Sequence, residues 1–260
     1  MFKRKRFERN NLDKDIEQSR YDGYAEKEIA ENLHSSGEDP LSDIAIIHRP
    51  PFLKYYEELS RLIQPNMTVL ELGAGTGRHN HIFQEIGCKI IAVDISQKSL
   101  EVYKLRNSTI ETIQASIEDI PLASDSVDVI VSSGSLSYGE PSKVDSEIYR
   151  LLKHDGDLVI LDSLNHNLVY KFNRYIHYLK NDRSRSTLRR IPNLKRLTAF
   201  SSRFESVSIS YFGSHLWVLS PLIRIFGLSN ISKVNYILEH IIPAQRFAFK
   251  FVLVARGFRK

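Results

Sequence analysis

The chain has 260 residues, of which 42% are hydrophobic and 26% are charged, and its formal net charge is +5. These proportions exclude general disorder, and the length fits one α/β domain with insertions. The single cysteine, Cys88, excludes an internal disulfide and a multi-thiolate metal site; no metal is expected, and a reducing, cytoplasmic setting is favoured.

Targeting signals and membrane spans are not expected. The basic residues 1–10 are followed by polar sequence, which does not fit a signal peptide. The most apolar segment, residues 216–228, is too short to span a bilayer and contains Arg224. We therefore expect a cytoplasmic protein that contacts the inner face of a membrane only peripherally, if at all.

Residues 1–45 are expected to form an N-terminal arm or lid. They are polar and charged, and their apolar positions follow no regular spacing, so one or two short helices are predicted. Residues 46–260 are expected to form the main domain, which begins with a helix after Pro51 that leads towards Pro65.

Strands and helices then alternate along the chain. Apolar stretches predict strands at residues 67–72, 89–94, 109–115, 127–133 and 157–162. Ser96 is suited to cap the helix after the second strand, and Ser142 with Asp145 resembles a capping box for a later helix. This alternation predicts a parallel sheet with helices on both faces.

Two long segments interrupt the alternation near the end of the chain. Further strands are predicted at residues 206–212 and 246–255, with insertions at about 163–205 and 213–245. Loops on a fixed scaffold often carry recognition, so these insertions are the expected places for binding a substrate.

Three glycines follow the first predicted strand. Gly73, Gly75 and Gly77 give G-x-G-x-G, and the helix that begins after them exposes N–H groups suited to acceptor groups of a ligand. The dinucleotide fingerprint is G-x-G-x-x-G, and Arg78 stands where its third glycine would be. The spacing therefore weakens, without removing, the alternative of an NAD(P)-dependent oxidoreductase.

Two carboxylates at strand ends narrow the choice of ligand. Glu71, just before the glycines, would repel a pyrophosphate and attract an ammonium group. Asp94, at the end of the second strand, can accept hydrogen bonds from both hydroxyls of a ribose, each contributing roughly 1.5–3 kcal/mol. A ligand that combines an amino acid with adenosine points to S-adenosylmethionine.

In these residues the sequence resembles the class I S-adenosylmethionine-dependent methyltransferases, in particular the small-molecule branch that includes the ubiquinone/menaquinone-biosynthesis type. The resemblance covers about residues 55–161 and rests on VLELGAGTG, AVDIS, ASIEDIPLASDSVDVIVSS and LLKHDGDLVILD. It implies a Rossmann-like, seven-stranded, mostly parallel sheet with an antiparallel last strand. It also implies S-adenosylmethionine as the cofactor and S-adenosylhomocysteine as its product.

The residues expected at the cofactor lie at the ends of three strands: Glu71, Gly73, Ala74, Gly75, Gly77, Asp94, Ile95, Ile117 and Glu118. By resemblance, the glycines and Ala74 would approach the methionine portion, Asp94 the ribose, and Ile95, Ile117 and Glu118 the adenine. Ser116 stands where relatives often have an acidic residue.

Methyl transfer from a sulfonium depends mainly on aligning the nucleophile, the methyl carbon and the sulfur. A hydroxyl acceptor would benefit from a base, and the candidates are His166 and Tyr138, whose plainer interpretations are a polar loop residue and a pocket wall. The fourth strand is followed by SSGSLSY and lacks the Asn/Asp-Pro-Pro-Tyr motif of many nitrogen methyltransferases. An oxygen or carbon acceptor is therefore expected.

Residues 171–196 are strongly basic and are opposed by Asp182 alone. Their cations are Lys171, Arg174, Lys180, Arg183, Arg185, Arg189, Arg190, Lys195 and Arg196. A solvated helical face, an anionic acceptor, an anionic membrane surface or RNA would each explain them.

The expected function is O-methylation of a small-molecule or lipid-linked acceptor by direct in-line transfer, in a monomeric or weakly oligomeric protein. Residues 162–212 loosely resemble bacterial methyltransferases associated with surface polysaccharides, which would make a glycan hydroxyl the acceptor. The alternatives are the NAD(P)-dependent oxidoreductase, a non-catalytic cofactor-binding partner protein and, among methyltransferases, a quinone-precursor or RNA acceptor.

Overall fold

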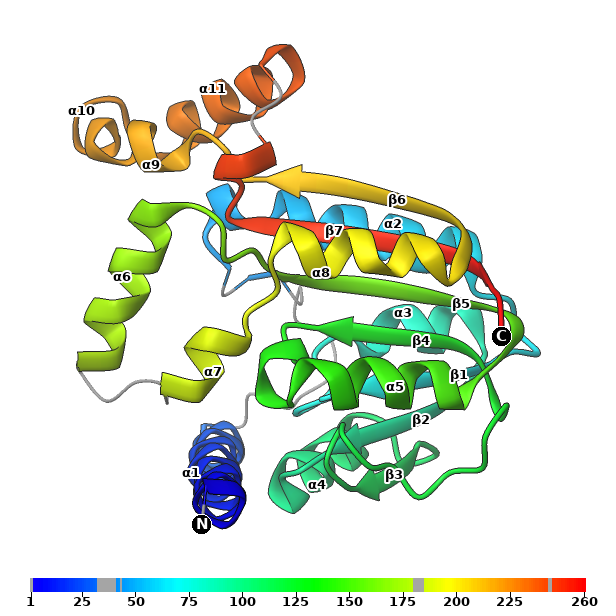
Figure 1. The fold of residues 1–260 in the computed structure, drawn as a ribbon. Helices are drawn as coiled ribbons and strands as arrows, with labels where there is room; N and C mark the ends of the chain where they lie inside the picture. The colour runs from blue at the N-terminus through cyan, green and yellow to red at the C-terminus, as the bar shows by residue number, and fades with distance from the viewer. Residues whose placement is uncertain (1, 32–40, 43, 180–184, 243–244) are drawn as a thin grey trace.

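One seven-stranded sheet organises the molecule (Figure 1), and its strand order is β3-β2-β1-β4-β5-β7-β6. The computed structural model describes residues 2–31, 41–42, 44–179, 185–242 and 245–260. The strands are β1 (Thr68–Leu72), β2 (Lys89–Asp94), β3 (Glu111–Gln114), β4 (Val127–Ser133), β5 (Leu152–Ser163), β6 (Phe204–Phe212) and β7 (Lys250–Phe258). Strands β1 to β5 pair in parallel, and β7 runs antiparallel between β5 and β6. The predicted sheet is confirmed.

The helices surround this sheet and extend beyond one of its edges (Figure 1). The α-helices are α1 (Phe2–Ala30), α2 (Pro50–Leu62), α3 (Asn80–Ile86), α4 (Gln97–Arg106), α5 (Pro141–Leu151), α6 (Leu168–Leu179), α7 (Arg185–Arg190), α8 (Leu194–Ala199), α9 (Leu216–Leu219), α10 (Ile223–Phe226) and α11 (Leu228–Ile241). Single 3-10 turns are η1 (Ile46–His48), η2 (Leu136–Tyr138), η3 (Phe200–Ser202), η4 (Ser220–Leu222) and η5 (Gln245–Phe247). Within the described residues, no helix combines the length and the apolarity needed to cross a membrane.

Alternate residues of each strand enter two cores, because successive side chains of a strand point to opposite faces. On one face, Leu70 and Ile130 pack with Ile148 of α5 and Leu197 of α8. On the other face, Val69 and its neighbours pack with α2, α3 and α4. The two cores hold the carboxyl ends of β1, β2 and β4 side by side, at the same end of the parallel strands.

The N-terminal segment differs from the prediction of one or two short helices. Residues 2–30 form a single helix of 29 residues, α1. Polar contacts with α4 hold it, since Glu26 pairs with Lys98, Glu28 pairs with Arg106, and the Ser96 hydroxyl donates to Asp22. A helix held by polar contacts needs no regular spacing of apolar residues, so that spacing does not reveal it.

Two local predictions can be compared directly with the helix ends. Ser96 caps α4 as expected, because the Ser99 N–H donates to its Oγ at 3.0 Å. The capping box is wrong: α5 begins at Pro141, and Asp145 pairs instead with Arg196, at 2.6 Å. Proline favours the first helical position because it has no N–H to satisfy there.

Strand β5 begins earlier than predicted, at Leu152 instead of Asp157. Leu152 already pairs with Val127 of β4, and the register shifts between Val127 and Val129. Asp155 adopts a left-handed backbone, with φ of 63°, so Asp155 and Gly156, which are residue types typical of a turn, form an irregularity within the strand.

Candidate cofactor and acceptor site

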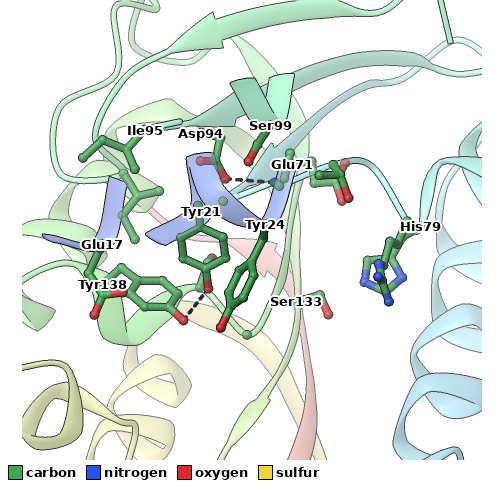
Figure 2. A pocket seen from close by; sticks show the side chains of 18 of the residues that line it. Glu17, Tyr21, Tyr24, Glu71, His79, Asp94, Ile95, Ser99, Ser133 and Tyr138 are labelled. Carbon is green, nitrogen blue, oxygen red and sulfur yellow. Dashed lines mark hydrogen bonds between the residues drawn. The ribbon is translucent and has the colours of Figure 1, made fainter. Parts of the chain in front are cut away.

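A cavity of about 510 Å³ opens at the carboxyl ends of β1, β2 and β4, beneath α1 (Figure 2). Its lining contains most of the residues expected at a cofactor: Glu71, Gly73, Ala74, Gly75, Asp94, Ile95 and Ile117, together with Tyr138. Gly77, Glu118 and His166 are not among its lining residues in the described part of the chain.

The glycine turn forms the floor of the cavity. A Cβ at Gly73 would lie 2.3 Å from the Cβ of Ser135, so the chain after β4 can approach β1 only because this residue lacks a side chain. Gly75 has a φ of 55°, and a Cβ there would meet nothing within 4 Å. Its backbone therefore faces open space that a ligand could fill.

Gly77 has an indirect role. A Cβ at this position would lie 2.2 Å from the ring of Tyr103. The Tyr103 hydroxyl donates to Glu71 at 2.8 Å. The missing side chain thus lets Tyr103 reach the carboxylate at the end of β1.

Glu71 is a buried acid, with 2% of its surface exposed. Burial raises its pKa to about 8; the Tyr103 hydrogen bond acts in the opposite direction, and the charge of Asp94 adds to the rise. A cation placed beside Glu71 would favour its ionised form. The site therefore suits a ligand that carries an ammonium group.

Asp94 is held by the backbone on both of its oxygens. It accepts from the N–H of Gly75 at 2.9 Å and from the N–H of Ser96 at 2.9 Å. Burial raises its pKa, and these hydrogen bonds counteract that rise. Each carboxylate oxygen retains a lone pair for a further donor, such as a ribose hydroxyl.

Ser99 provides an additional polar group in the cavity lining. Its Oγ is buried and has no hydrogen-bond partner among the described residues. A buried hydroxyl without a partner is costly, so it favours a polar ligand at this point. Together with Glu71, Asp94 and the open face of Gly75, it fits an adenosine cofactor that carries an amino acid.

Ile95 and Ile117 line the cavity where the adenine is expected, but Glu118 is engaged elsewhere. Its carboxylate accepts from Lys14 of α1 at 2.7 Å and from the N–H of Glu140 at 2.6 Å. In this arrangement Glu118 fastens α1 to the start of α5.

Helix α1 forms a wall of the cavity, so the predicted arm lies directly over the site (Figure 2). The Tyr21 hydroxyl donates to the Tyr138 oxygen at 2.5 Å, and Arg20 donates to the same oxygen at 3.2 Å. Burial raises the pKa of Tyr21, so its hydroxyl keeps its proton. Two donors thus occupy the Tyr138 oxygen and leave its own proton to donate.

The two predicted catalytic residues lie in different places. Tyr138, in η2, lines the cavity. Its contacts favour positioning an acceptor over removing a proton. His166 is exposed between β5 and α6, outside the cavity lining. Both assignments remain predictions.

His79 is a candidate that the sequence did not single out. It lines the cavity, and its Nδ1 lies 2.8 Å from the Tyr56 hydroxyl. Burial lowers its pKa to about 3, helped by the nearby His81 and Arg78. The imidazole is therefore neutral. The sequence feature that could have identified His79 is its position two residues after Gly77.

The basic segment is partly used inside the structure. Arg174 donates to the backbone oxygen of Leu164 at 2.9 Å, and Arg196 pairs with Asp145. Arg190 is buried near Glu140. Exposed cations remain at Lys171, Arg189 and Lys195, whereas Lys180 and Arg183, and the side chain of Arg185, lie outside the described residues.

Comparison with known proteins agrees with this geometry. Residues 70–160 match the family described as methyltransferase domain. The chain is 32% identical over 99 residues to a demethylmenaquinone methyltransferase of Renibacterium salmoninarum, covering 38% of this chain and 42% of that protein. It is 29% identical over 110 residues to a malonyl-[acyl-carrier protein] O-methyltransferase of Buchnera aphidicola, covering 42% and 44%. The chain thus spans less than half the length of these relatives.

Solved structures share the fold. Geranyl diphosphate C-methyltransferase from Streptomyces coelicolor, in complex with S-adenosylhomocysteine, superposes with a TM-score of 0.55 at 16% identity, covering 78% of this chain and 76% of that one. Residues 70–160 therefore form a methyltransferase domain. The chain shares the fold of such methyltransferases, and its residues 70–160 are similar in sequence to their domain.

Proposed function

We propose that the chain is an S-adenosylmethionine-dependent methyltransferase that O-methylates a small-molecule or lipid-linked acceptor, such as a glycan hydroxyl, by direct in-line transfer. One observation carries the proposal: Glu71, the glycine turn and Asp94 surround one cavity within a methyltransferase domain. When bound, the cofactor supplies an electrophilic methyl group on a sulfonium.

Each part of the cavity has a defined task in this proposal. Glu71 would hold the amino group of the cofactor, and Asp94 would accept from its ribose. Ile95 and Ile117 would enclose the adenine. These contacts fix the sulfonium relative to an acceptor, and alignment of this kind accounts for much of the rate of a displacement.

The acceptor would lie under α1, between Tyr138 and His79. Tyr138 has a proton to donate and can orient an acceptor oxygen. His79 is neutral, and in the tautomer whose Nδ1–H donates to Tyr56 its Nε2 can accept from an acceptor hydroxyl, but a pKa of about 3 makes it a weak base. His166 would act only on an acceptor that extends beyond the cavity.

The proposed acceptor class is argued from the insertions of this chain and not from the curated relatives. Their matches cover 38% and 42% of this chain, and the matched domain ends at residue 160. The insertions after β5 and β6 lie outside that domain, and they carry apolar exposed side chains suited to a lipid-linked molecule. A quinone precursor and RNA are therefore outcomes to be tested.

The test begins with the cofactor. Native mass spectrometry of the purified protein is expected to show bound S-adenosylhomocysteine, and Asp94→Ala is expected to lose it while remaining folded by circular dichroism. Tight binding of NADH without binding of S-adenosylhomocysteine would contradict the proposal.

Labelled cofactor then identifies the acceptor. Extracts are incubated with the protein, and methyl label is expected in a glycan or lipid-linked fraction. Label in quinone precursors or RNA would replace the acceptor while keeping the reaction. Cofactor binding without label in any fraction would favour a non-catalytic partner protein.

A further inference from the structure

The insertion between β6 and β7, residues 213–249, stands away from the sheet. Figure 1 shows α9, α10 and α11 projecting beyond β6, whereas α1 lies towards the opposite edge of the sheet, near α4. The insertion is anchored at its base, where the Tyr170 hydroxyl of α6 donates to the Gly213 oxygen at 2.8 Å. Helix α11 also packs against η1, and Asn167 donates to the Phe247 oxygen at 3.4 Å, so the insertion is attached at its base and along part of α11.

This insertion exposes large apolar side chains on three consecutive helices. Ile225 is 74% exposed and Phe226 is 56% exposed in α10, and Ile241 is 69% exposed at the end of α11. Helix α11 buries only Ile231 and Asn235. Large exposed apolar side chains gathered on one insertion form a surface typical of an interaction site. We call it the insertion surface.

Cations outnumber acids in the insertion by three to one. Its cations are Arg224, Lys233 and Arg246, all exposed. Its single acid is Glu239, which accepts from the N–H of Ser214 at 2.9 Å. Exposed apolar side chains together with a net positive charge are the combination that binds an anionic lipid surface.

The same charges argue against a second copy of the chain as the occupant. In a symmetric contact the same surface of both copies would meet, so two surfaces of equal net positive charge would face each other. The helices are also too short to span a bilayer. An interfacial position remains, with the apolar side chains among the acyl chains and the cations at the headgroups.

From these observations we propose that the insertion surface docks the protein on an anionic lipid bilayer. A series of contacts connects the insertion with the helix over the cavity: α6 contacts the insertion and α7, and Thr187 of α7 donates to Glu17 of α1 at 2.8 Å. This function differs from that expected of residues 171–196, where Arg174, Arg190 and Arg196 are engaged within the structure.

Trp217 provides the measurement. It is the single tryptophan of the chain, it lies in α9, and its ring stacks on Phe247 with centroids 5.6 Å apart. Vesicles of phosphatidylcholine and phosphatidylglycerol are expected to shift its fluorescence to shorter wavelength. Brominated acyl chains are expected to quench it. Vesicles of phosphatidylcholine alone are expected to bind more weakly.

Three variants make the test specific. Ile225→Glu/Phe226→Glu is expected to weaken partitioning at least about tenfold, since two large apolar side chains no longer enter the bilayer. Arg224→Gln/Lys233→Gln is expected to lower the affinity for anionic vesicles roughly fivefold per cation removed. The affinity for vesicles of phosphatidylcholine alone should not change. Leu105→Glu, at an equally exposed leucine of α4 (59%), is the control and is expected to bind as the parent does.

Several results would overturn the proposal. Examples are an absent shift with anionic vesicles, an unchanged shift in Ile225→Glu/Phe226→Glu, or binding to a soluble polyanion without acyl quenching. A dimer that the same variant dissociates, without vesicle binding, would make the surface an interface between copies. Circular dichroism and S-adenosylhomocysteine affinity verify folding. Because no methyl transfer is needed, failure of this proposal is separate from failure of the proposed function.

Discussion

Glu71 and Asp94 line the same cavity, but hydrogen bonds stabilise the ionised form of Asp94 more than that of Glu71. Two backbone N–H groups stabilise the ionised form of Asp94, whereas Glu71 receives one phenol hydroxyl and is otherwise desolvated. Hydrogen bonds to a carboxylate favour its charge, and burial disfavours it. Glu71 is thus the residue whose proton should respond to a bound ligand.

The affinity for S-adenosylhomocysteine should depend on pH through Glu71. With a pKa of about 8, Glu71 is mainly protonated at pH 7 in the free protein. A bound ammonium group requires the ionised form, so affinity should rise with pH by at most about tenfold per unit up to about pH 8. Glu71→Gln should bind more weakly and without this rise. Titration calorimetry at several pH values measures both, and parallel curves would contradict the assignment.

The same proton affects the stability of the ligand-free protein. The folded-state pKa of about 8 lies above the ordinary value of 4.5, so the folded state binds the proton more tightly than the unfolded state. This contribution to stability is complete below pH 4.5 and is lost as the pH rises to about 8. In urea denaturation, the free energy of unfolding of Glu71→Gln should lack this decrease with pH. A decrease equal to that of the parent protein would show that Glu71 is not its source.

Two glycines of the turn should respond differently to alanine. Gly77→Ala places a Cβ against the Tyr103 ring at a φ of 73°, and should lower the free energy of unfolding by about 2 kcal/mol or more. Gly75→Ala has free space and should cost only about 1 kcal/mol of backbone strain, while its methyl group obstructs the cofactor. Denaturation and S-adenosylhomocysteine titration separate the two effects. Equal losses of stability would contradict the assignment.

At the scale of elements, α1 closes the cavity by polar contacts. The Arg106–Glu28 pair is largely buried, and the Lys98–Glu26 pair is exposed. Exposed ion pairs contribute little, whereas loss of one partner of a buried pair is costly. The two pairs join the same helices and therefore form a matched comparison.

Arg106→Ala should loosen α1, and Lys98→Ala should not. We expect Arg106→Ala to release S-adenosylhomocysteine about tenfold faster and to expose α1 to limited proteolysis, as the loss of roughly 1–3 kcal/mol implies. Lys98→Ala should remain within about twofold of the parent protein. Equal protection of α1 in both variants would show that the buried pair does not hold it.

The sequence predicted the part of the site that depends on strand ends. Glu71 and Asp94 follow apolar strands, and parallel strands that end at one edge bring their last residues together. The position of α1 was not predictable in this way, because its contacts are ion pairs between Glu28 and α4 and between Lys14 and Glu118. His79 was missed for a similar reason, since only the packing of Tyr56 shows that it faces the cavity.

In the molecule as a whole, the insertion between β6 and β7 can be removed without interrupting the sheet. Strands β6 and β7 are neighbours up to the pair Phe212 and Lys250, and the Phe249 N–H donates to Phe212 at 2.8 Å. The two ends of the insertion are therefore adjacent. A short turn can join them without changing the register of the sheet.

Replacing residues 214–247 by a short turn should keep cofactor binding and abolish vesicle binding. Affinity for S-adenosylhomocysteine should stay within about twofold, because the insertion contributes none of the cavity lining among the described residues. Vesicle flotation and calorimetry measure the two properties. Loss of cofactor binding in a variant that keeps its circular dichroism spectrum would show that the insertion supports the site.

The contact between Tyr21 and Tyr138 has a consequence for the time course of the proposed reaction. A helix fastened across the cavity encloses the spent cofactor as firmly as the fresh one, so each turnover must wait for α1 to lift. Lid opening of this kind often limits turnover. A rapid-quench experiment should then show a burst of methylated product close to the enzyme concentration, followed by a slower steady rate, and Tyr21→Phe should raise the steady rate while leaving the burst intact.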